Sequence, residues 1–199
     1  MQVERIIARY LDEHLYNNAT FTKHLRTDNL SEQLKGSDIV LSNPSLNLEN
    51  VVVDEKAITH YLTEQIPTFA LELSFIARNG SLMEGWFTDT DKVTDYYLFA
   101  WPLADKEWDI ELSNIKHVDY ALVKRSKIIE WLSNQGFPIE KLREKAEIIR
   151  NTVTENGPID KVYGKDFWFF MSERLAECPI NVIIKRSVYE KLAVLTGHC

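Results

Sequence analysis

The stretch TFALELSFI, residues 68–76, is the feature that most constrains the fold of this chain. Its large apolar residues Phe69, Leu71, Leu73 and Phe75 alternate with smaller or polar residues. Successive side chains of a β-strand point to opposite faces, so a period of two predicts a strand with one buried face. The chain must therefore contain a sheet that covers an apolar core.

Other stretches extend this picture to a mixed set of strands and helices. Further strands are predicted over residues 38–42, 51–56, 94–103, 118–124 and 180–185. A polar connection over residues 43–50 joins the first two of these strands, which predicts an antiparallel hairpin, and Asn79-Gly80 predicts another. Helical spacing of apolar residues predicts helices over residues 1–16, 126–136, 138–157 and from Ser187 onward.

The order of these elements is helix, strands, helices, strand and helix. It is typical of an α/β or α+β protein built around one central β-sheet. At 199 residues the chain is expected to form a single domain, residues 1–199, with a small two-lobed arrangement as the alternative.

Composition narrows the cellular setting and the cofactor. The two cysteines, Cys178 and Cys199, form neither a CxxC pair nor a cluster with histidine, so a structural zinc site is not expected. The N-terminus MQVERIIARYLDEHLY is charged and amphipathic, unlike a secretory signal. No apolar run approaches the roughly 20 residues of a membrane span. The sequence therefore predicts a cytoplasmic protein that does not bind membranes.

Charge is distributed unevenly along the chain. The net charge is −7, which argues against a general polyanion binder, because phosphate affinity comes largely from Lys and Arg. Residues 1–119 carry a net charge of −10, whereas residues 120–199 carry +3. Any nucleic acid is therefore expected to meet the second half of the chain.

Charged residues follow directly on three valines in the stretch NVVVDEKA, residues 50–57. Charged groups are seldom fully buried unless they are paired or bind a metal. Because side chains alternate along a strand, Asp54 and Lys56 share one face and Glu55 lies on the other. Asp38 begins the neighbouring strand. If the two strands pair, Asp38 approaches Asp54 and Lys56 and the three form one cluster.

Two carboxylates and a lysine suit a hydrolytic magnesium site. Mg²⁺ prefers oxygen ligands and commonly takes one or two protein carboxylates together with waters and phosphate oxygens. Such a metal makes hydroxide accessible near neutral pH and offsets charge on an attacked phosphate. Lys56 would orient the attacking water or stabilise the developing negative charge. The predicted catalytic residues are Asp38, Asp54 and Lys56.

The same residues resemble a known family. GSDIVLS, residues 36–42, followed by NVVVDEKA is similar to the PD-(D/E)xK, or restriction-endonuclease-like, nuclease superfamily. The resemblance places the first acid of the superfamily on Asp38 and its (D/E)xK motif on residues 54–56, although Ser37 stands where the motif has proline. It implies a mixed central sheet with helices on both faces.

The resemblance extends beyond this motif. The stretches SEQLKGSD, TFALELSF and GWF…TDYYLFAW are similar to a branch of microbial and phage proteins with this nuclease core. The similarity covers residues 1–103 and, more weakly, CPINVIIKRSVYEKLA at residues 178–193. The superfamily often adds an acid from the preceding helix, for which Glu4, Asp12 and Glu13 all qualify.

Each of these residues also has a simpler interpretation. Asp54 and Lys56 can form an ordinary ion pair at a strand end that reaches solvent, and Asp38 can cap a turn. Glu72 can complete the carboxylate cluster or hold Lys56 in place, or face solvent beside Ser74.

Gln33 is also open to two interpretations, because it can touch a substrate or cap a helix end. Gln33, Glu72 and Glu4 are therefore kept as supporting residues of the predicted site.

The sequence favours a metal-dependent nuclease that hydrolyses phosphodiester bonds, with DNA as the first candidate substrate. Asp38, Asp54 and the backbone carbonyl of Glu55 are the predicted ligands of Mg²⁺ or Mn²⁺. The alternative is a catalytically inactive module with the nuclease fold that binds nucleic acid or a protein partner, which the acidic balance favours. A third interpretation is a structural protein whose aromatic edge pairs in a homodimer.

Overall fold

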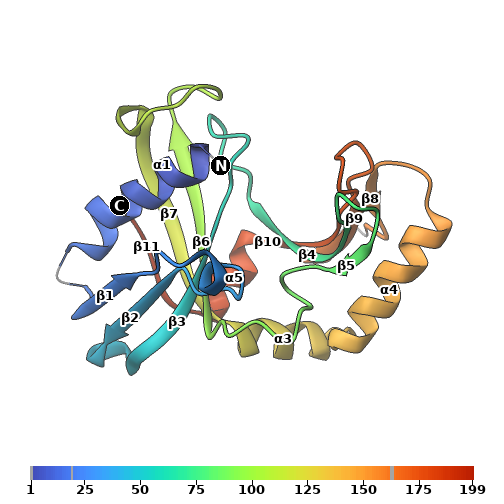
Figure 1. Ribbon diagram of the computed structural model, residues 1–199, viewed down its shortest axis with the longest axis horizontal. Coiled ribbons are helices and arrows are strands. Elements are labelled where there is room, and N and C mark those ends of the chain that lie inside the picture. Colours follow the sequence, from blue (N-terminus) through green and yellow to red (C-terminus); the bar gives the residue numbers. More distant parts are fainter. Residues whose placement is uncertain (1, 19, 162–163) are drawn as a thin grey trace. The chain divides into compact units, whose positions relative to one another are not determined.

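The computed structural model describes residues 2–18, 20–161 and 164–199, which combine helices and β-sheets in an α+β fold (Figure 1). The chain divides into two compact units. The first unit takes the chain up to Pro67 together with Val93–Arg125 and Glu190–Cys199, and the second takes Thr68–Lys92 and Ser126–Tyr189. The expectation of a single domain stays a prediction.

In the part of the first unit that the structure describes, six strands form a mixed sheet in the order β1-β2-β3-β6-β7-β11. The strands are β1 (Lys23–Arg26), β2 (Ile39–Asn43), β3 (Leu48–Ala57), β6 (Tyr96–Ala104), β7 (Ile115–Lys124) and β11 (Ala193–His198). Strands β3 and β6 pair in parallel, whereas β2 and β3 form the predicted antiparallel hairpin, with Ile39 opposite Val53. This hairpin brings the end of β3 beside the start of β2.

The core of the first unit lies between this sheet and the N-terminal helix. Helix α1 (Gln2–Leu11) continues into a π-helical turn (Asp12–Tyr16), so the predicted helix over residues 1–16 is confirmed for its described residues. Ile7, Leu11 and Leu15 are fully buried in one cluster with sheet residues such as Val53 and Leu122. Burial of one such side chain stabilises the fold by about 1.5–3 kcal/mol. The apolar stripe of the helix therefore fixes its position over β3.

Two strands of this sheet were not expected from the sequence. Strand β1 is short and its side chains are mostly exposed, so no apolar period marks it. Strand β11 follows directly on helix α5 (Arg186–Leu192), and the pattern from Ser187 onward predicted only the helix. The short helix α2 (Leu30–Gln33) lies between β1 and β2.

In the second unit, the described residues form a five-stranded antiparallel sheet in the order β5-β4-β10-β9-β8. The strands are β4 (Thr68–Ile76), β5 (Leu82–Glu84), β8 (Gly157–Ile159), β9 (Phe167–Met171) and β10 (Ile180–Lys185). The predicted bounds of β4 and β10 are confirmed, as is the hairpin at Asn79-Gly80, where Gly80 has a φ of 83°. Only glycine adopts this left-handed conformation without strain.

The helices of the second unit are α3 (Arg125–Asn134), whose first residue belongs to the first unit, and α4 (Ile139–Thr152). Leu142, Ala146 and Ile149 form the buried stripe of α4, which packs on β4 and β10. The predicted extension of this helix to Gly157 is wrong. The helix ends at Thr152, where β-branched residues reduce helix propensity, and Gly157 begins β8.

The prediction of one central sheet is also corrected. Strands β4 and β10 belong to the antiparallel sheet of the second unit, whereas β2, β3, β6 and β7 belong to the mixed sheet of the first. Hydrophobic period shows which face of a strand is buried but not which strand pairs with it. No helix among the described residues is both long enough and apolar enough to span a membrane.

Candidate functional site

Asp38 lies immediately before β2 and is attached to β3 at two points. Its backbone N–H donates to the carbonyl oxygen of Val53 at 3.0 Å, and its Oδ2 accepts from the backbone N–H of Glu55 at 2.8 Å. Thr94 Oγ1 donates to the carbonyl of Gly36 at 2.8 Å and so holds the preceding turn. These bonds fix the Asp38 carboxylate against the end of β3, as the hairpin predicted.

Asp54 and Lys56 lie on the same face of β3, two residues apart. Lys56 Nζ lies 2.7 Å from Asp54 Oδ1, and the Asp54 side chain is only 4% exposed whereas that of Lys56 is 24% exposed. The Asp54 carboxylate is also within hydrogen-bonding reach of the Asp38 carboxylate. The structure therefore brings Asp38, Asp54 and Lys56 into one cluster.

The electrostatics of this cluster are unfavourable for two ionised acids. The pKa of Asp38 is raised to about 6, first by burial of its carboxyl group and second by the charge of the neighbouring Asp54. The Glu55 N–H and the Lys56 ammonium act in the opposite direction but do not cancel these effects. Two carboxylates that share a site disfavour joint ionisation. A cation bound between them would remove this repulsion.

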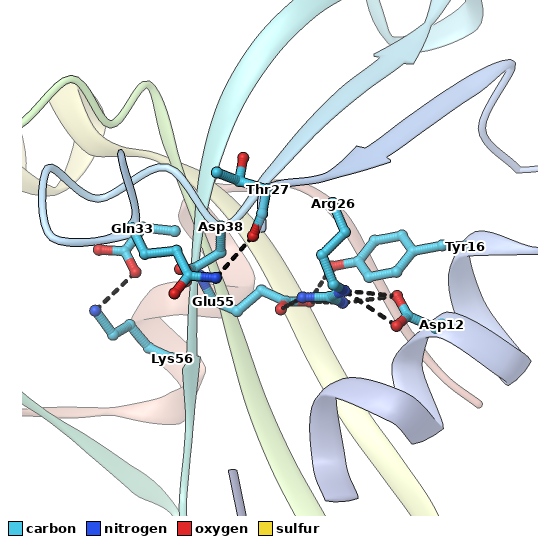
Figure 2. Close-up of polar contacts among 9 residues, drawn as sticks. Asp12, Tyr16, Arg26, Thr27, Gln33, Asp38, Glu55 and Lys56 are labelled. Atoms are coloured by element: carbon cyan, nitrogen blue, oxygen red, sulfur yellow. Dashed lines mark hydrogen bonds and ion pairs between the residues drawn. The ribbon is translucent and has the colours of Figure 1, made fainter. Parts of the chain in front are cut away.

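Glu55 points to the other face of β3, where Arg26 and Tyr16 satisfy its carboxylate. Arg26 Nη1 lies 2.5 Å from Glu55 Oε2, and the Tyr16 hydroxyl donates to Glu55 Oε1 at 2.8 Å. Arg26 also contacts Asp12 at 2.7 Å. Figure 2 shows Lys56 on one side of the strand and Arg26, Tyr16 and Asp12 on the other. The prediction that Glu55 and Lys56 face opposite ways is confirmed.

This second cluster has its own pKa pattern. Burial raises the pKa of Glu55, whereas the hydrogen bonds and charge of Arg26 lower it and offset part of that effect. Burial would lower the pKa of Arg26, but Glu55 and Asp12 together raise it above its ordinary value. The guanidinium therefore stays charged and holds two acids at once, one from β3 and one from the π-helical turn after α1.

The supporting residues occupy different parts of the fold. Gln33 ends α2, and its side-chain amide donates to the Thr27 carbonyl at 2.7 Å, which favours the structural interpretation (Figure 2). Glu4 lies exposed in the first turn of α1. Glu72 lies on β4 in the second unit, opposite Asn181 of β10. The roles of these three residues at the site stay predictions.

Arg26 and Tyr16 are the residues that sequence reasoning missed. Arg26 ends a strand that no apolar pattern marks, and Tyr16 was counted only within an amphipathic helix. Asp12 was one of three candidates for the helical acid, and the structure joins it to Glu55 through Arg26. Glu13, another candidate, pairs with Arg9 on the exposed side of the helix.

The donor atoms of the first cluster fit Mg²⁺, which prefers carboxylate and carbonyl oxygens. In antiparallel pairing, the N–H and C=O of one residue point toward the same neighbour. Because the Glu55 N–H points to Asp38, the Glu55 carbonyl faces that side too. The described residues contain no group of three His, Cys, Asp or Glu side chains that could hold a metal ion. If a metal binds at this cluster, Asp38, Asp54 and a backbone carbonyl would be its protein ligands.

Comparisons with known proteins identify no relative of this chain. No family model matches it, and neither a curated protein nor a solved structure matches it. The functional conclusion therefore depends on the geometry of Asp38, Asp54 and Lys56.

Proposed function

We propose that this protein is a metal-dependent nuclease with a restriction-endonuclease-like core and that DNA is its substrate. The observation that supports this proposal is the contact between two carboxylates, the partly buried Asp38 and the buried Asp54, beside the Lys56 ammonium. An acid such as Asp38, with a raised pKa and a specific charged partner, is typical of functional sites. An acid pair with no ligand to bind would instead be a net cost to folding.

Each residue of the cluster has a distinct task in phosphodiester hydrolysis. Asp38, Asp54 and the Glu55 carbonyl would hold Mg²⁺ or Mn²⁺, which supplies Lewis acidity and a more acidic bound water. Lys56 is partly exposed, so its ammonium can reach both Asp54 and a water or phosphate oxygen outside the strand. The attacking water loses one proton as its oxygen bonds to phosphorus, one P–O ester bond breaks, and the departing oxygen takes up a proton in turn. Lys56 would orient the water or stabilise the added negative charge.

The charge distribution bears on how DNA would bind. In the second half of the chain, where nucleic acid is expected to bind, Lys127 and Lys185 each already pair with an acid, Glu130 at 2.8 Å and Asp166 at 3.1 Å respectively. Both pairs are exposed and therefore weak, so phosphate can compete for these lysines. Binding is expected to be salt-sensitive because phosphate contacts release counterions.

A catalytically inactive module that binds nucleic acid or a protein partner is the second candidate. The net charge of −7 favours it, since an acidic surface weakens contact with a long duplex. The direct ion pair between Lys56 and Asp54 also stabilises the cluster without a metal. Under this hypothesis, Asp38 and Asp54 serve the fold only.

The deciding experiment incubates the full chain with supercoiled plasmid and with single-stranded DNA, in Mg²⁺, in Mn²⁺ and in EDTA. The nuclease proposal predicts metal-dependent cleavage that Asp54→Asn lowers about a hundredfold or more, because an amide keeps the shape of the side chain but loses its charge. Glu49→Gln is the matched control, because Glu49 is an exposed acid on the same strand. It is expected to cleave like the wild type.

Calorimetric titration with Mn²⁺ separates metal binding from catalysis. The proposal predicts saturable Mn²⁺ binding to the wild type and to Glu49→Gln, and much weaker binding to Asp54→Asn. Equal cleavage by all three proteins would show a contaminating nuclease. A wild type that neither binds Mn²⁺ nor cleaves would overturn the enzyme proposal and leave the binding module.

A further inference from the structure

A second candidate site lies in the first unit, at the loops that follow β3 and β6 (Figure 1). A cavity of about 450 Å³ is lined by His60, Tyr61, Thr63, Glu64, Glu107 and Trp108. This volume falls within the roughly 300–1,000 Å³ of ordinary small-molecule pockets. None of these residues belongs to the clusters around β3, so the cavity requires a separate explanation.

The aromatic rings of this cavity are unusually exposed. Trp108 is 70% exposed and Tyr61 is 60% exposed, although Trp and Tyr are largely buried in most proteins. The His60 and Trp108 rings lie 6.2 Å apart at 58° to each other. The aromatic surface is therefore available to a ligand at the mouth of the cavity.

The loop that carries Tyr61 is held rigidly. Tyr61 has a φ of 61°, a left-handed conformation that is strained for a bulky residue. The Tyr61 N–H donates to Glu107 Oε1 at 2.5 Å, and the Leu62 N–H donates to Glu107 Oε2 at 2.7 Å. Leu62 is itself fully buried, next to Ala104. These contacts fix the backbone at Tyr61, which lines the same cavity as Trp108.

The charge of the cavity identifies the class of ligand. Glu64 and Glu107 line it, and Asp109 follows Trp108 directly. Carboxylates repel phosphate, so a nucleotide does not fit, and a purely apolar partner would bury these acids without compensation. A cation with an apolar surface satisfies both the acids and the aromatic faces.

We propose that this cavity binds a quaternary ammonium group, and the proposal is independent of the nuclease proposal. Both carboxylate oxygens of Glu107 already accept backbone N–H groups, so Glu107 offers negative charge but no free bidentate geometry for a guanidinium. A quaternary ammonium needs no hydrogen bond and binds aromatic faces by cation–π attraction. Its source is either a free choline-like molecule or a trimethylated lysine side chain.

Isothermal titration calorimetry on the full chain tests the proposal, with choline and tetramethylammonium chloride as the probes. The matched control ligand is 3,3-dimethylbutan-1-ol, in which carbon replaces the charged nitrogen of choline. We expect saturable binding of both cations and none of the alcohol. Absence of saturable binding, or equal binding of the alcohol, would overturn the proposal.

Variants locate the binding in the cavity. Trp108→Ala is expected to weaken choline binding at least about fivefold, Glu64→Gln by a similar factor, and Trp108→Phe less than Trp108→Ala. Leu25→Ala removes another exposed apolar side chain of the same unit and should bind like the wild type. Circular dichroism confirms that each variant is folded. If Trp108→Ala binds normally, the cavity is not the site.

A binding experiment with peptides distinguishes the two possible sources of the ammonium group. A short peptide that contains trimethyl-lysine is compared with the same peptide that contains unmodified lysine and with free choline. Tighter binding of the methylated peptide than of choline assigns the cavity to a protein partner. Equal or weaker binding of the peptide assigns it to a free small molecule.

Discussion

The two faces of β3 carry acids in opposite electrostatic situations. On one face, Glu55 is nearly buried, yet Arg26 and Tyr16 satisfy its carboxylate and Arg26 is anchored again by Asp12. On the other face, Asp38 and Asp54 lie against each other with Lys56 beside them. Neighbouring residues of one strand thus belong to two clusters that each contain two acids and one cation. In one cluster the cation contacts both acids, whereas in the other the two acids also contact each other.

The difference shows which cluster serves the fold and which has capacity for a ligand. The Arg26 cluster pairs each charge with a partner from another element, so it joins β1, β3 and the turn after α1. The Asp38 cluster holds two acids, and burial together with the charge of Asp54 raises the pKa of Asp38 to about 6. A site that binds a cation is expected to have unfavourable repulsion between its carboxylates when the cation is absent. Functional sites of this kind often reduce the stability of the fold.

The largest expected loss of stability comes from removing the guanidinium of the Arg26 cluster. Arg26→Met leaves the Glu55 carboxylate buried without its guanidinium partner, and should reduce the free energy of unfolding by about 3–4 kcal/mol. Urea unfolding followed by circular dichroism measures this loss. Arg9→Ala is the matched control, because it breaks an exposed pair with Glu13 and should change stability by less than about 0.5 kcal/mol.

A double variant sharpens this prediction. Arg26→Met combined with Glu55→Met removes both charges and replaces them with apolar side chains of similar length, so it should recover most of the lost stability. If the double variant is as unstable as Arg26→Met alone, the pairing with Glu55 is not the cause. The instability would then come from the loss of Asp12 or of packing around Arg26.

The stability of the Asp38 cluster is expected to change in the opposite direction when a charge is removed. Asp38→Asn keeps an oxygen that accepts from the Glu55 N–H and adds an amide that can donate to Asp54. It should raise the free energy of unfolding by about 1–2 kcal/mol at pH 8 while abolishing metal-dependent cleavage. Urea unfolding and the plasmid assay are the two measurements. A destabilised Asp38→Asn protein would mean that Asp38 serves the fold.

The pH dependence of stability tests the raised pKa of Asp38 without a ligand. The pKa of Asp38 is raised from its ordinary 3.8 to about 6, so between these values the folded state keeps a proton that the unfolded state releases. Stability from this group therefore falls as pH rises from about 4 to 6, and the full penalty of about 1–2 kcal/mol is present above pH 6.

Comparison of two proteins isolates this contribution from all other titrations. Urea unfolding of the wild type and of Asp38→Asn is measured at pH 4 and at pH 8. The stability advantage of Asp38→Asn should be small at pH 4 and widen toward pH 8. An advantage that is the same at both pH values would show that the gain is not electrostatic.

The sequence predicted the Asp38 cluster better than the Arg26 cluster. Asp38, Asp54 and Lys56 lie on strands with a clear apolar pattern, so alternation and one hairpin sufficed to bring them together. Arg26 lies on an exposed four-residue strand, and its partners come from residues 12, 16 and 55. No local pattern encodes such long-range pairing.

The fold shows the same limit. Strands β4 and β10 were located to the residue, because period two marks them. Their assignment to a separate sheet was missed, since the hydrophobic period of a strand does not show which strand pairs with it. The end of α4 was also missed, because a distant glycine was a weaker signal than the β-branched residues around Thr152.

The smallest of the expected effects tests how completely Glu55 is satisfied. Tyr16→Phe removes the hydroxyl that donates to Glu55 Oε1 at 2.8 Å but leaves Arg26 Nη2 at 3.2 Å from the same oxygen. The loss should therefore be about 1 kcal/mol, the net value of one hydrogen bond, and urea unfolding measures it. Cleavage should be unchanged, since Tyr16 lies on the face of β3 away from Lys56. A loss as large as that of Arg26→Met would mean that the hydroxyl, and not the guanidinium, is what keeps this carboxylate charged.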